Sequence, residues 1–281
     1  NNGVITNTGE FNNHWLMYNK NSLSNEGKLT NVSTGSLSNT SKISNKSSGN
    51  FTNFGEINNQ ATIENAGVLS NQGTLKNNGI ITNSGQFITT DGHIVSGTGE
   101  FIQTAGSTTV NGSMTQKNVN INGGNLNGHG VINSNVFVNG TSYSDYASLT
   151  PGNSIGKLTV NGNYTQGTFG AMNIEFDGNS TDVFAVNGVA TLAGVLSFDF
   201  IGSELKAGIF NFMTFSSLVG SFDNIILPLM SGFDFDVIFG DTFANLVITE
   251  SVSAVPVPAA IFLFAPALLG FIGIRRRVSQ R

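Results

Sequence analysis

The residues that could perform acid–base chemistry are few and scattered. Glycosidases need two nearby carboxylates, and polysaccharide lyases combine carboxylates with a Lys or Arg base. Coil stacking could bring Glu56 near Glu64, although at non-equivalent positions, and no arginine occurs before residue 275. We therefore expect no catalytic residues and no enzyme activity. The acids of the first 170 residues are widely spaced: Glu10, Glu26, Glu56, Glu64, Asp91, Glu100 and Asp145.

Histidine, serine and cysteine offer no alternative chemistry. His14, His93 and His129 stand alone, without metal-ligand spacing, and are typical of solvated loop or strand residues. No Gly-x-Ser-x-Gly motif followed by Asp and His is present. The chain contains no cysteine, which excludes disulfides and thiolate zinc sites. We expect no cofactor.

One acidic loop is a weak calcium candidate. The segment from Asp177 to Asp182, DGNSTD, places several oxygen ligands in a single loop. It lacks the EF-hand spacing and a closing glutamate. An ordinary turn between two strands is the alternative, because Asp, Asn and Gly are typical turn residues.

A phenylalanine-rich stretch at 198–243 contains ten phenylalanines that alternate with polar residues. Alternation predicts strands with one apolar face. We interpret this stretch as a cap that closes one end of a repeat structure, because open ends expose unpaired edges. An aromatic platform for carbohydrate is the alternative, although the only tryptophan of the chain is Trp15.

The composition excludes two large classes of protein. Only 10% of the 281 residues are charged, whereas Asn (38 residues) and Gly (35) are abundant. Asn and Gly are poor helix formers, which excludes a helical bundle. The net charge of −5 and the absence of a basic face exclude a nucleic-acid partner.

A six-residue repeat, Gly-x-apolar-x-Asn-x, fills the first 88 residues, with two-residue shifts before Leu37 and Phe51. Alternate residues of a strand share one face, so the apolar residue and Asn point the same way. One apolar residue in six suits stacked coils, in which Asn side chains can form amide ladders. Thirteen successive repeats carry the asparagine: Asn7, Asn13, Asn19, Asn25, Asn31, Asn39, Asn45, Asn53, Asn59, Asn65, Asn71, Asn77 and Asn83.

The repeat predicts an all-β parallel β-solenoid, with a disordered linker as the less consistent alternative. The six-residue period is typical of left-handed coils, whereas the insertions and irregular later segments favour a right-handed β-helix. Past residue 88 the strict period gives way to short alternating strands. Asn-Gly pairs there indicate either hairpin turns or solenoid corners.

Residues 149–166, LTPGNSIGKLTVNGNYTQ, resemble the late passenger region of autotransporter-type β-helix proteins. The resemblance covers about 100 residues directly and implies a β-helical body displayed at a cell surface. The residues after 250 are too few to form an outer-membrane barrel. The structural motif consists of Pro151, Gly152, Asn153, Ser154 and Gly156.

The last 27 residues differ sharply from the body. Residues 259–274 form an uninterrupted apolar run, about 24 Å long as a helix, which is short for a span but sufficient with residues 255–258 included. A buried core helix is the alternative. By the positive-inside rule, the following basic cluster predicts a cytoplasmic tail and an external body. That cluster is Arg275, Arg276 and Arg277.

This tail resembles the PEP-CTERM sorting signal, which combines a proline motif, an apolar helix and a terminal basic cluster. Val257 occupies the position of glutamate in the eponymous Pro-Glu-Pro. The resemblance implies a Gram-negative source, recognition and cleavage by an exosortase, and an association with exopolysaccharide or biofilm systems. The proline motif consists of Val255, Pro256, Val257, Pro258, Ala259 and Ala260.

These features predict six regions: a hexad-repeat solenoid (1–88), irregular coils (89–175), a β-rich cap (176–250), a linker (251–258), a transmembrane helix (259–274) and a basic tail (275–281). The missing leader at Asn1 indicates a fragment or a mature form.

We expect an exported, non-catalytic surface or matrix protein of structural or adhesive type, held transiently in the inner membrane by its tail. A carbohydrate-binding or carbohydrate-processing β-helix and an uncleaved tail-anchored protein are the alternatives. Retention on a polysaccharide column, or two convergent acids on one solenoid face, would favour carbohydrate; a body that stays in the inner-membrane fraction would indicate an uncleaved anchor.

Overall fold

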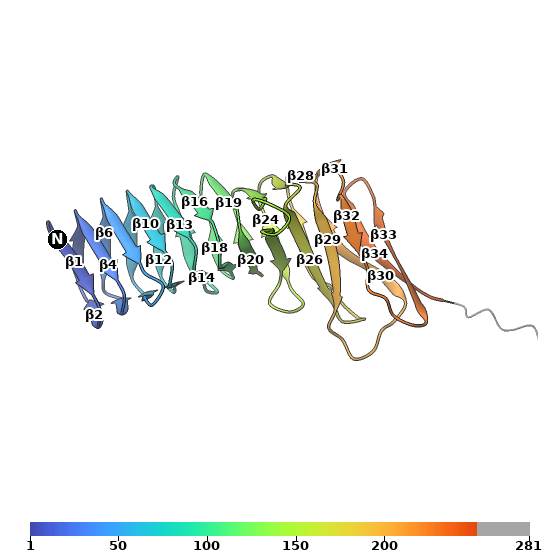
Figure 1. Cartoon of the computed structure of the whole chain (residues 1–281), viewed down its shortest axis with the longest axis horizontal. Coiled ribbons are helices and arrows are strands. Elements are labelled where there is room, and N and C mark those ends of the chain that lie inside the picture. The colour runs from blue at the N-terminus through green and yellow to red at the C-terminus, as the bar shows by residue number, and fades with distance from the viewer. Residues whose placement is uncertain (252–281) are drawn as a thin grey trace, which may run out of the picture.

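The computed structural model describes residues 1–251. Within this range the chain is all-β, a parallel stacked-coil β-solenoid of about 10 turns. Figure 1 shows the coils following one another along a single axis, with the N-terminus at one end. Each coil contributes one strand to each of three sheets, so that residues of successive coils, such as Asn7 and Asn25 or Asn25 and Asn45, lie side by side. The predicted solenoid is confirmed.

Sheet A contains eleven parallel strands, each paired with the strand three places later in the chain. They are β1 (Val4–Asn7), β4 (Ser22–Asn25), β7 (Lys42–Asn45), β10 (Thr62–Asn65), β13 (Ile80–Asn83), β16 (Glu100–Gln103), β19 (Asn118–Ile121), β22 (Asn135–Val138), β25 (Tyr164–Gln166), β28 (Val189–Leu192) and β31 (Ser217–Gly220).

Sheet B also contains eleven parallel strands, and four of the later ones, β20, β23, β26 and β29, are longer than the four-residue strands that open the sheet. They are β2 (Glu10–Asn13), β5 (Lys28–Asn31), β8 (Asn50–Asn53), β11 (Val68–Asn71), β14 (Gln86–Thr89), β17 (Ser107–Val110), β20 (Gly124–Gly128), β23 (Ala147–Pro151), β26 (Gly170–Phe176), β29 (Val195–Phe200) and β32 (Asn224–Ile226).

Sheet C contains twelve strands and includes the antiparallel pairs of the fold. They are β3 (Leu16–Asn19), β6 (Ser36–Asn39), β9 (Glu56–Asn59), β12 (Thr74–Asn77), β15 (Ile94–Ser96), β18 (Ser113–Met114), β21 (Val131–Ile132), β24 (Lys157–Val160), β27 (Val183–Val186), β30 (Gly208–Thr214), β33 (Phe233–Phe239) and β34 (Phe243–Glu250).

The thirteen repeat asparagines are all buried and form three amide ladders, one in each sheet. In sheet A, the Nδ2 of Asn25 donates to the Oδ1 of Asn45 and the Nδ2 of Asn45 to the Oδ1 of Asn65, both at 2.7 Å. The Nδ2 of Asn45 also donates to the carbonyl of Val68 at 2.9 Å. Each rung thus satisfies amide groups that would cost about 1–3 kcal/mol if buried without partners. The predicted ladders are confirmed.

The apolar residue of each repeat lies two positions before the asparagine and packs into the same interior. Leu37, Ile57 and Leu75 succeed one another in sheet C and are completely buried. Complete burial of such a side chain contributes about 1.5–3 kcal/mol. The intervening residues point outward, as the alternating burial of the strands shows.

The corners between strands are tight, because successive coils touch through their backbones. A Cβ on Gly73 would overlap the carbonyl oxygen of Gly55 in the preceding coil. The two-residue insertions of the repeat form turns at the corners, closed by hydrogen bonds from Gly35 N–H to the Val32 carbonyl (2.7 Å) and from Gly49 N–H to the Lys46 carbonyl (2.8 Å). The strands flanking Asn-Gly pairs such as 111–112 are parallel to their neighbours, so these pairs form corners rather than hairpins.

The last strands close the far end of the rod (Figure 1). Parallel pairing continues through β32, whereas β34 pairs antiparallel with both β30 and β33. Aromatic contacts join this cap to the last coils: the rings of Phe198 and Phe212 lie 5.0 Å apart, and those of Phe176 and Phe235 lie 6.2 Å apart. The phenylalanine-rich stretch thus contributes to the core at this end.

Candidate functional site

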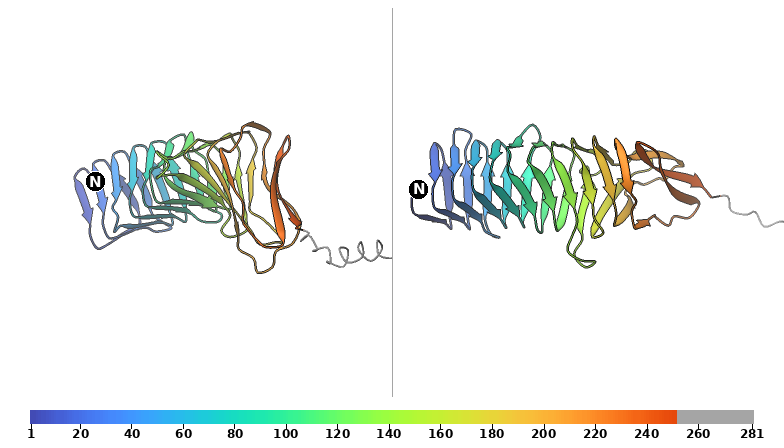
Figure 2. Two further views of the ribbon diagram at one scale, coloured as in Figure 1. Left: turned by 45° about the vertical axis from the view of Figure 1, so that its right-hand side comes forward. Right: turned by 90° about the horizontal axis from the view of Figure 1, so that it is seen from above.

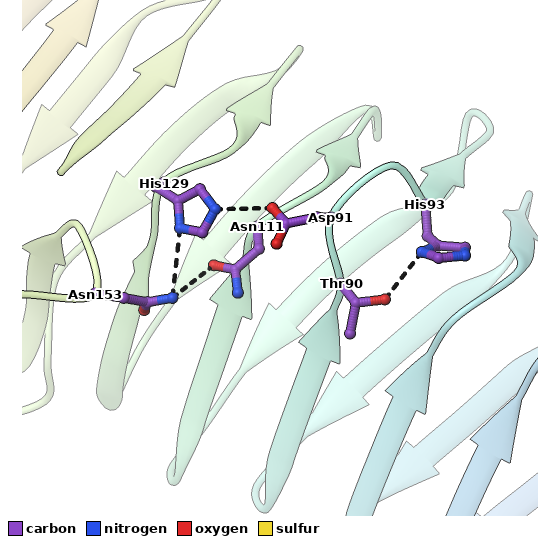
Figure 3. A network of polar contacts seen from close by, with 6 residues as sticks. All are labelled: Thr90, Asp91, His93, Asn111, His129 and Asn153. Carbon is purple, nitrogen blue, oxygen red and sulfur yellow. Dashed lines mark hydrogen bonds and ion pairs between the residues drawn. The ribbon is translucent and has the colours of Figure 1, made fainter.

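Four polar side chains form a row along the corner between sheets B and C (Figure 3). We call this row, Asp91, Asn111, His129 and Asn153, the polar corner. Its members lie in the turns that follow β14, β17, β20 and β23, so coil stacking aligns residues distant in sequence. The Nε2 of His129 lies 2.8 Å from the Oδ1 of Asp91, and the Nδ2 of Asn153 donates to the Oδ1 of Asn111 at 3.1 Å.

The polar corner is solvated. The Asp91 side chain is 75% exposed and the His129 side chain is 38% exposed. Exposed ion pairs contribute at most about 1 kcal/mol. His93 makes a local contact instead, with its Nδ1 2.9 Å from the Thr90 hydroxyl. The sequence predicts isolated, solvated histidines. It does not indicate the contact of His129 with Asp91, because the two residues lie 38 positions apart.

The motif that resembles autotransporter passengers forms a strained turn next to the polar corner. Gly152 has φ of 85° and Ser154, a residue with a side chain, has φ of 72°. The Gly156 N–H donates to the Oδ1 of Asp182 at 2.9 Å, and a Cβ on Gly152 would lie 2.5 Å from that oxygen. The turn therefore wraps around the Asp182 carboxylate of the next coil.

Asp182 is a fully buried carboxylate held by backbone groups. Its Oδ1 accepts the Gly156 N–H, and its Oδ2 accepts the Glu175 N–H at 3.0 Å. Burial raises the pKa of Asp182 to about 6, and the negative charge of Glu175 acts in the same direction. The two N–H groups oppose this shift by stabilising the charged form. No sequence pattern indicates the contact between Asp182 and Gly156, because the two residues lie 26 positions apart in the chain.

Asp177 and Asp182, the calcium candidates, engage different backbone groups. The Oδ1 of Asp177 accepts the N–H groups of Asn179 (2.8 Å) and Ser180 (2.7 Å) in a local turn. These two N–H groups lower the pKa of Asp177. Both oxygens of Asp182 bond to backbone amides. Among residues 1–251, no three His, Cys, Asp or Glu side chains are grouped in a way that could hold a metal ion.

The two acids that coil stacking could have brought together lie on different sheets. Glu56 is in β9 of sheet C, whereas Glu64 is in β10 of sheet A. Glu64 instead forms an ion pair with Lys42 at 2.7 Å, and this hydrogen bond lowers the pKa of Glu64. A different pair, Glu175 and Asp199, consists of register partners on β26 and β29. Sequence reasoning missed this pair, because 24 residues separate its members.

The predicted sorting motif (255–260), the predicted transmembrane segment (259–274) and the basic cluster (275–277) lie outside the described residues. In the range 1–251, the structure contains no helix that is long and apolar enough to cross a membrane.

The outer face of sheet B in the later coils, the polar corner and Asp182 in the loop before β27 thus carry the chemistry of the described chain. They offer an imidazole–carboxylate contact, a buried carboxylate and one pair of adjacent acids. No known family of proteins matches the chain, and no curated protein is significantly similar to it.

Proposed function

We propose that the chain is the rod of an exported, non-catalytic surface or matrix protein of structural or adhesive type. In this proposal the rod is a right-handed β-helix, an exosortase-type enzyme recognises and cleaves the tail, and the body reaches the cell surface or the medium. The inner membrane holds the protein only transiently, through the apolar segment at 259–274.

The observation that carries the proposal is the continuous stack of coils with three internal amide ladders. Its about 10 turns, at roughly 4.8 Å each, extend for about 48 Å. The interior is filled by side chains, so an activity must lie on the outside. An elongated body with few charges suits a spacer or an adhesive surface better than it suits an enclosed active site.

The tail supports the export part of the proposal. All four arginines of the chain are among the last seven residues, and three of them follow the apolar run directly. This arrangement favours an external body under the positive-inside rule. The Val-Pro-Val-Pro segment before the run is where cleavage would release the body.

The test is fractionation with intact-mass measurement in a Gram-negative host that has an exosortase. An epitope tag placed before Val255 reports the body. We expect a product that lacks the apolar and basic segments and is found on the surface or in the medium. Replacing Pro256 and Pro258 by Ala should leave an uncleaved product in the inner membrane.

The matched control is Pro266→Ala, which changes a proline in the same tail but outside the motif. It should be cleaved like the unaltered chain. If the unaltered chain stays full-length in the inner membrane, the sorting proposal is contradicted and the tail is a plain membrane anchor.

A second candidate function, carbohydrate processing, is favoured by the adjacent acids Glu175 and Asp199. Register partners on neighbouring parallel strands are about 4.8 Å apart along the sheet, close to the roughly 5 Å between the carboxyls of retaining glycosidases. Release of reducing sugar from a polysaccharide, lost in both Glu175→Gln and Asp199→Asn, would establish this function. Activity that survives both changes would exclude this pair.

A further inference from the structure

The loop between β22 and β23 presents two tyrosines beside a surface hollow. The loop, residues 139–146, stands out from the side of the rod (Figure 2). Tyr143 is 72% exposed, and its ring lies 4.9 Å from that of Phe169 and 6.3 Å from that of Tyr146. An aromatic residue this exposed gains little from folding, so its burial by a ligand is favourable.

The loop is held in place before any ligand binds. The Gly140 and Ala147 N–H groups both donate to the Phe169 carbonyl, at 2.9 and 3.1 Å. Inside the loop, the Thr141 hydroxyl donates to the Oδ2 of Asp145 at 2.8 Å. Such a loop loses little conformational entropy on binding, which strengthens affinity.

Two adjoining hollows lie between this loop and the last parallel coils. One, of about 440 Å³, follows the corner between sheets A and B and is lined by Tyr143, Tyr146, Thr168, Gly194, Val195, Asp223 and Asn224. The other, of about 540 Å³, covers the outer face of sheet B and is lined by Tyr146, Ser148, Ala171, Asn173, Val195, Asn224 and Ile226. They share three residues and thus form one groove.

Small side chains form the floor of the groove. Its polar groups are neutral apart from one carboxylate. Ala171 and Val195 are register partners and provide the apolar floor. Ser148, Asn173 and Asn224 present hydroxyl and amide groups beside it. Asp223 uses its Oδ2 to accept the Gly194 N–H at 2.7 Å. Among the described residues that line the groove, none is Lys, Arg or His.

We propose that this groove binds a neutral polysaccharide. A sugar ring has an apolar C–H face that packs on an aromatic ring and hydroxyl edges that bond to amides and carboxylates. The tyrosines and the neutral polar groups supply both kinds of contact. An acidic polysaccharide would bring negative charge to Asp223 without a cation to balance it, which disfavours binding. The inference deepens the proposed adhesive function by naming a class of partner.

The experiment is affinity electrophoresis of the full chain, in mild non-ionic detergent, through gels that contain dextran, hydroxyethylcellulose, galactomannan or alginate. We expect retardation by at least one neutral polymer and none by alginate. Tyr143→Ala and Tyr146→Ala should each weaken binding at least tenfold. Tyr18→Ala, at a tyrosine that is 48% exposed in the first coil, should bind like the unaltered chain.

A second variant tests the groove without altering the loop. Val195→Lys places a long side chain on the floor and should also abolish retardation, whereas Val219→Lys, at an exposed site on β31, should not. Lack of retardation by every neutral polymer, or retardation unchanged in Tyr143→Ala and Val195→Lys, would overturn the proposal. If these variants change the sedimentation coefficient but keep the retardation, the groove is a contact between copies of the chain. That result would also overturn the proposal.

This binding measurement is made on purified protein and does not depend on export. A chain that binds polysaccharide but stays in the inner membrane would contradict only the sorting proposal. A chain that is sorted but does not bind would contradict only the groove.

Discussion

The two halves of the rod fill the interior of their coils with different side chains. In the first half, up to Thr89, each sheet repeats one apolar residue and one asparagine, and amide ladders run through the coils. In the second half, apolar or other residues occupy the ladder positions. In sheet A, Asn83 is followed in register by Gln103, Ile121 and Val138.

The ladders of sheets A and C end in specific contacts, whereas the ladder of sheet B does not. In sheet C, the Nδ2 of Asn77 donates to the Oε1 of Gln116, two coils later in the stack, at 2.6 Å. In sheet A, the Asn83 Nδ2 donates to the Ser107 carbonyl at 2.9 Å. In sheet B, the ladder ends at Thr89, whose buried hydroxyl has no hydrogen-bond partner in the described structure.

The two halves differ in how much sequence variation they tolerate. A ladder requires the same residue at the same depth in every coil, so it restricts the sequence of the coils and leaves only short corners. Where the ladders stop, aromatic packing stabilises the coils, and the corners carry longer segments such as the tyrosine loop at 139–146. Candidate sites gather in the second half for this reason.

The largest effect is expected in the aromatic core of the second half. Phe176→Ala removes a fully buried ring that lies 5.3 Å from the ring of Phe200. We expect a loss of about 3–5 kcal/mol in unfolding free energy. Hydrogen exchange should show deprotection of the cap and last coils, while the first half stays protected, because coils contact only their neighbours.

Phe137→Ala is the control for this change, since that ring is on the outer face of β22 and is 39% exposed. It should alter stability by less than about 1 kcal/mol. Equal deprotection of both halves in Phe176→Ala would mean that the rod unfolds as one unit and that the two halves are not energetically distinct.

The next effect separates the ladder from ordinary polar surface. Asn59→Ala removes the acceptor of the Asn39 amide and the donor to Asn77, two bonds of 2.7 and 2.6 Å. The Asn77 Oδ1 loses this donor, whereas the Asn39 Nδ2 keeps the Ser41 and Thr62 carbonyls as acceptors. The change should cost about 1–3 kcal/mol, measured by denaturant unfolding. The neighbouring Asn58→Ala removes only an exposed contact with Gln60 and should cost less than about 0.5 kcal/mol. Similar losses of unfolding free energy in both variants would mean that the ladder stabilises the fold no more than an exposed polar contact does.

The third effect is a pH dependence confined to the second half. The pKa of Asp182 rises from 3.8 in an unfolded chain to about 6 in the fold. The folded state therefore binds a proton more readily between these values, and stability falls as pH rises from about 4 to about 6, by up to about 3 kcal/mol. Thermal unfolding across this range should show the decline, and Asp182→Asn should flatten it. Stability that rises through this window equally in both proteins would contradict the assignment.

The repeat half could be predicted closely from the sequence, and the second half only in outline. Thirteen asparagines in phase specify which residues point inward, and periodicity alone predicts the ladders and the stacking. The contact between Asp182 and Gly156 and the pair Glu175–Asp199 depend on the register between irregular coils. That register follows from corner lengths that carry no periodic signal, so no sequence pattern could place these side chains together.

The tyrosine loop illustrates the same limit. The sequence leaves open an aromatic platform in the phenylalanine-rich stretch, of which Phe198, Phe212 and Phe222 are buried in the core. Tyr143 is exposed, and the partly exposed Tyr146 lines the groove beside it. Their importance follows from the hydrogen bonds that fix the loop to Phe169, which lies in a later coil.

The smallest effect concerns the polar corner, which begins at the boundary between the halves. His129→Ala removes the contact with Asp91 of 2.8 Å, yet the exposure of Asp91 keeps its contribution small. We expect a change of less than about 1 kcal/mol in unfolding free energy, and a smaller one in 1 M salt, because solvent and ions screen such pairs. Asp91→Asn should behave in the same way, and the double variant should differ little from the sum of the singles. A loss of several kcal/mol from either single change would mean that this corner, rather than the ladders or the aromatic core, joins the two halves of the rod.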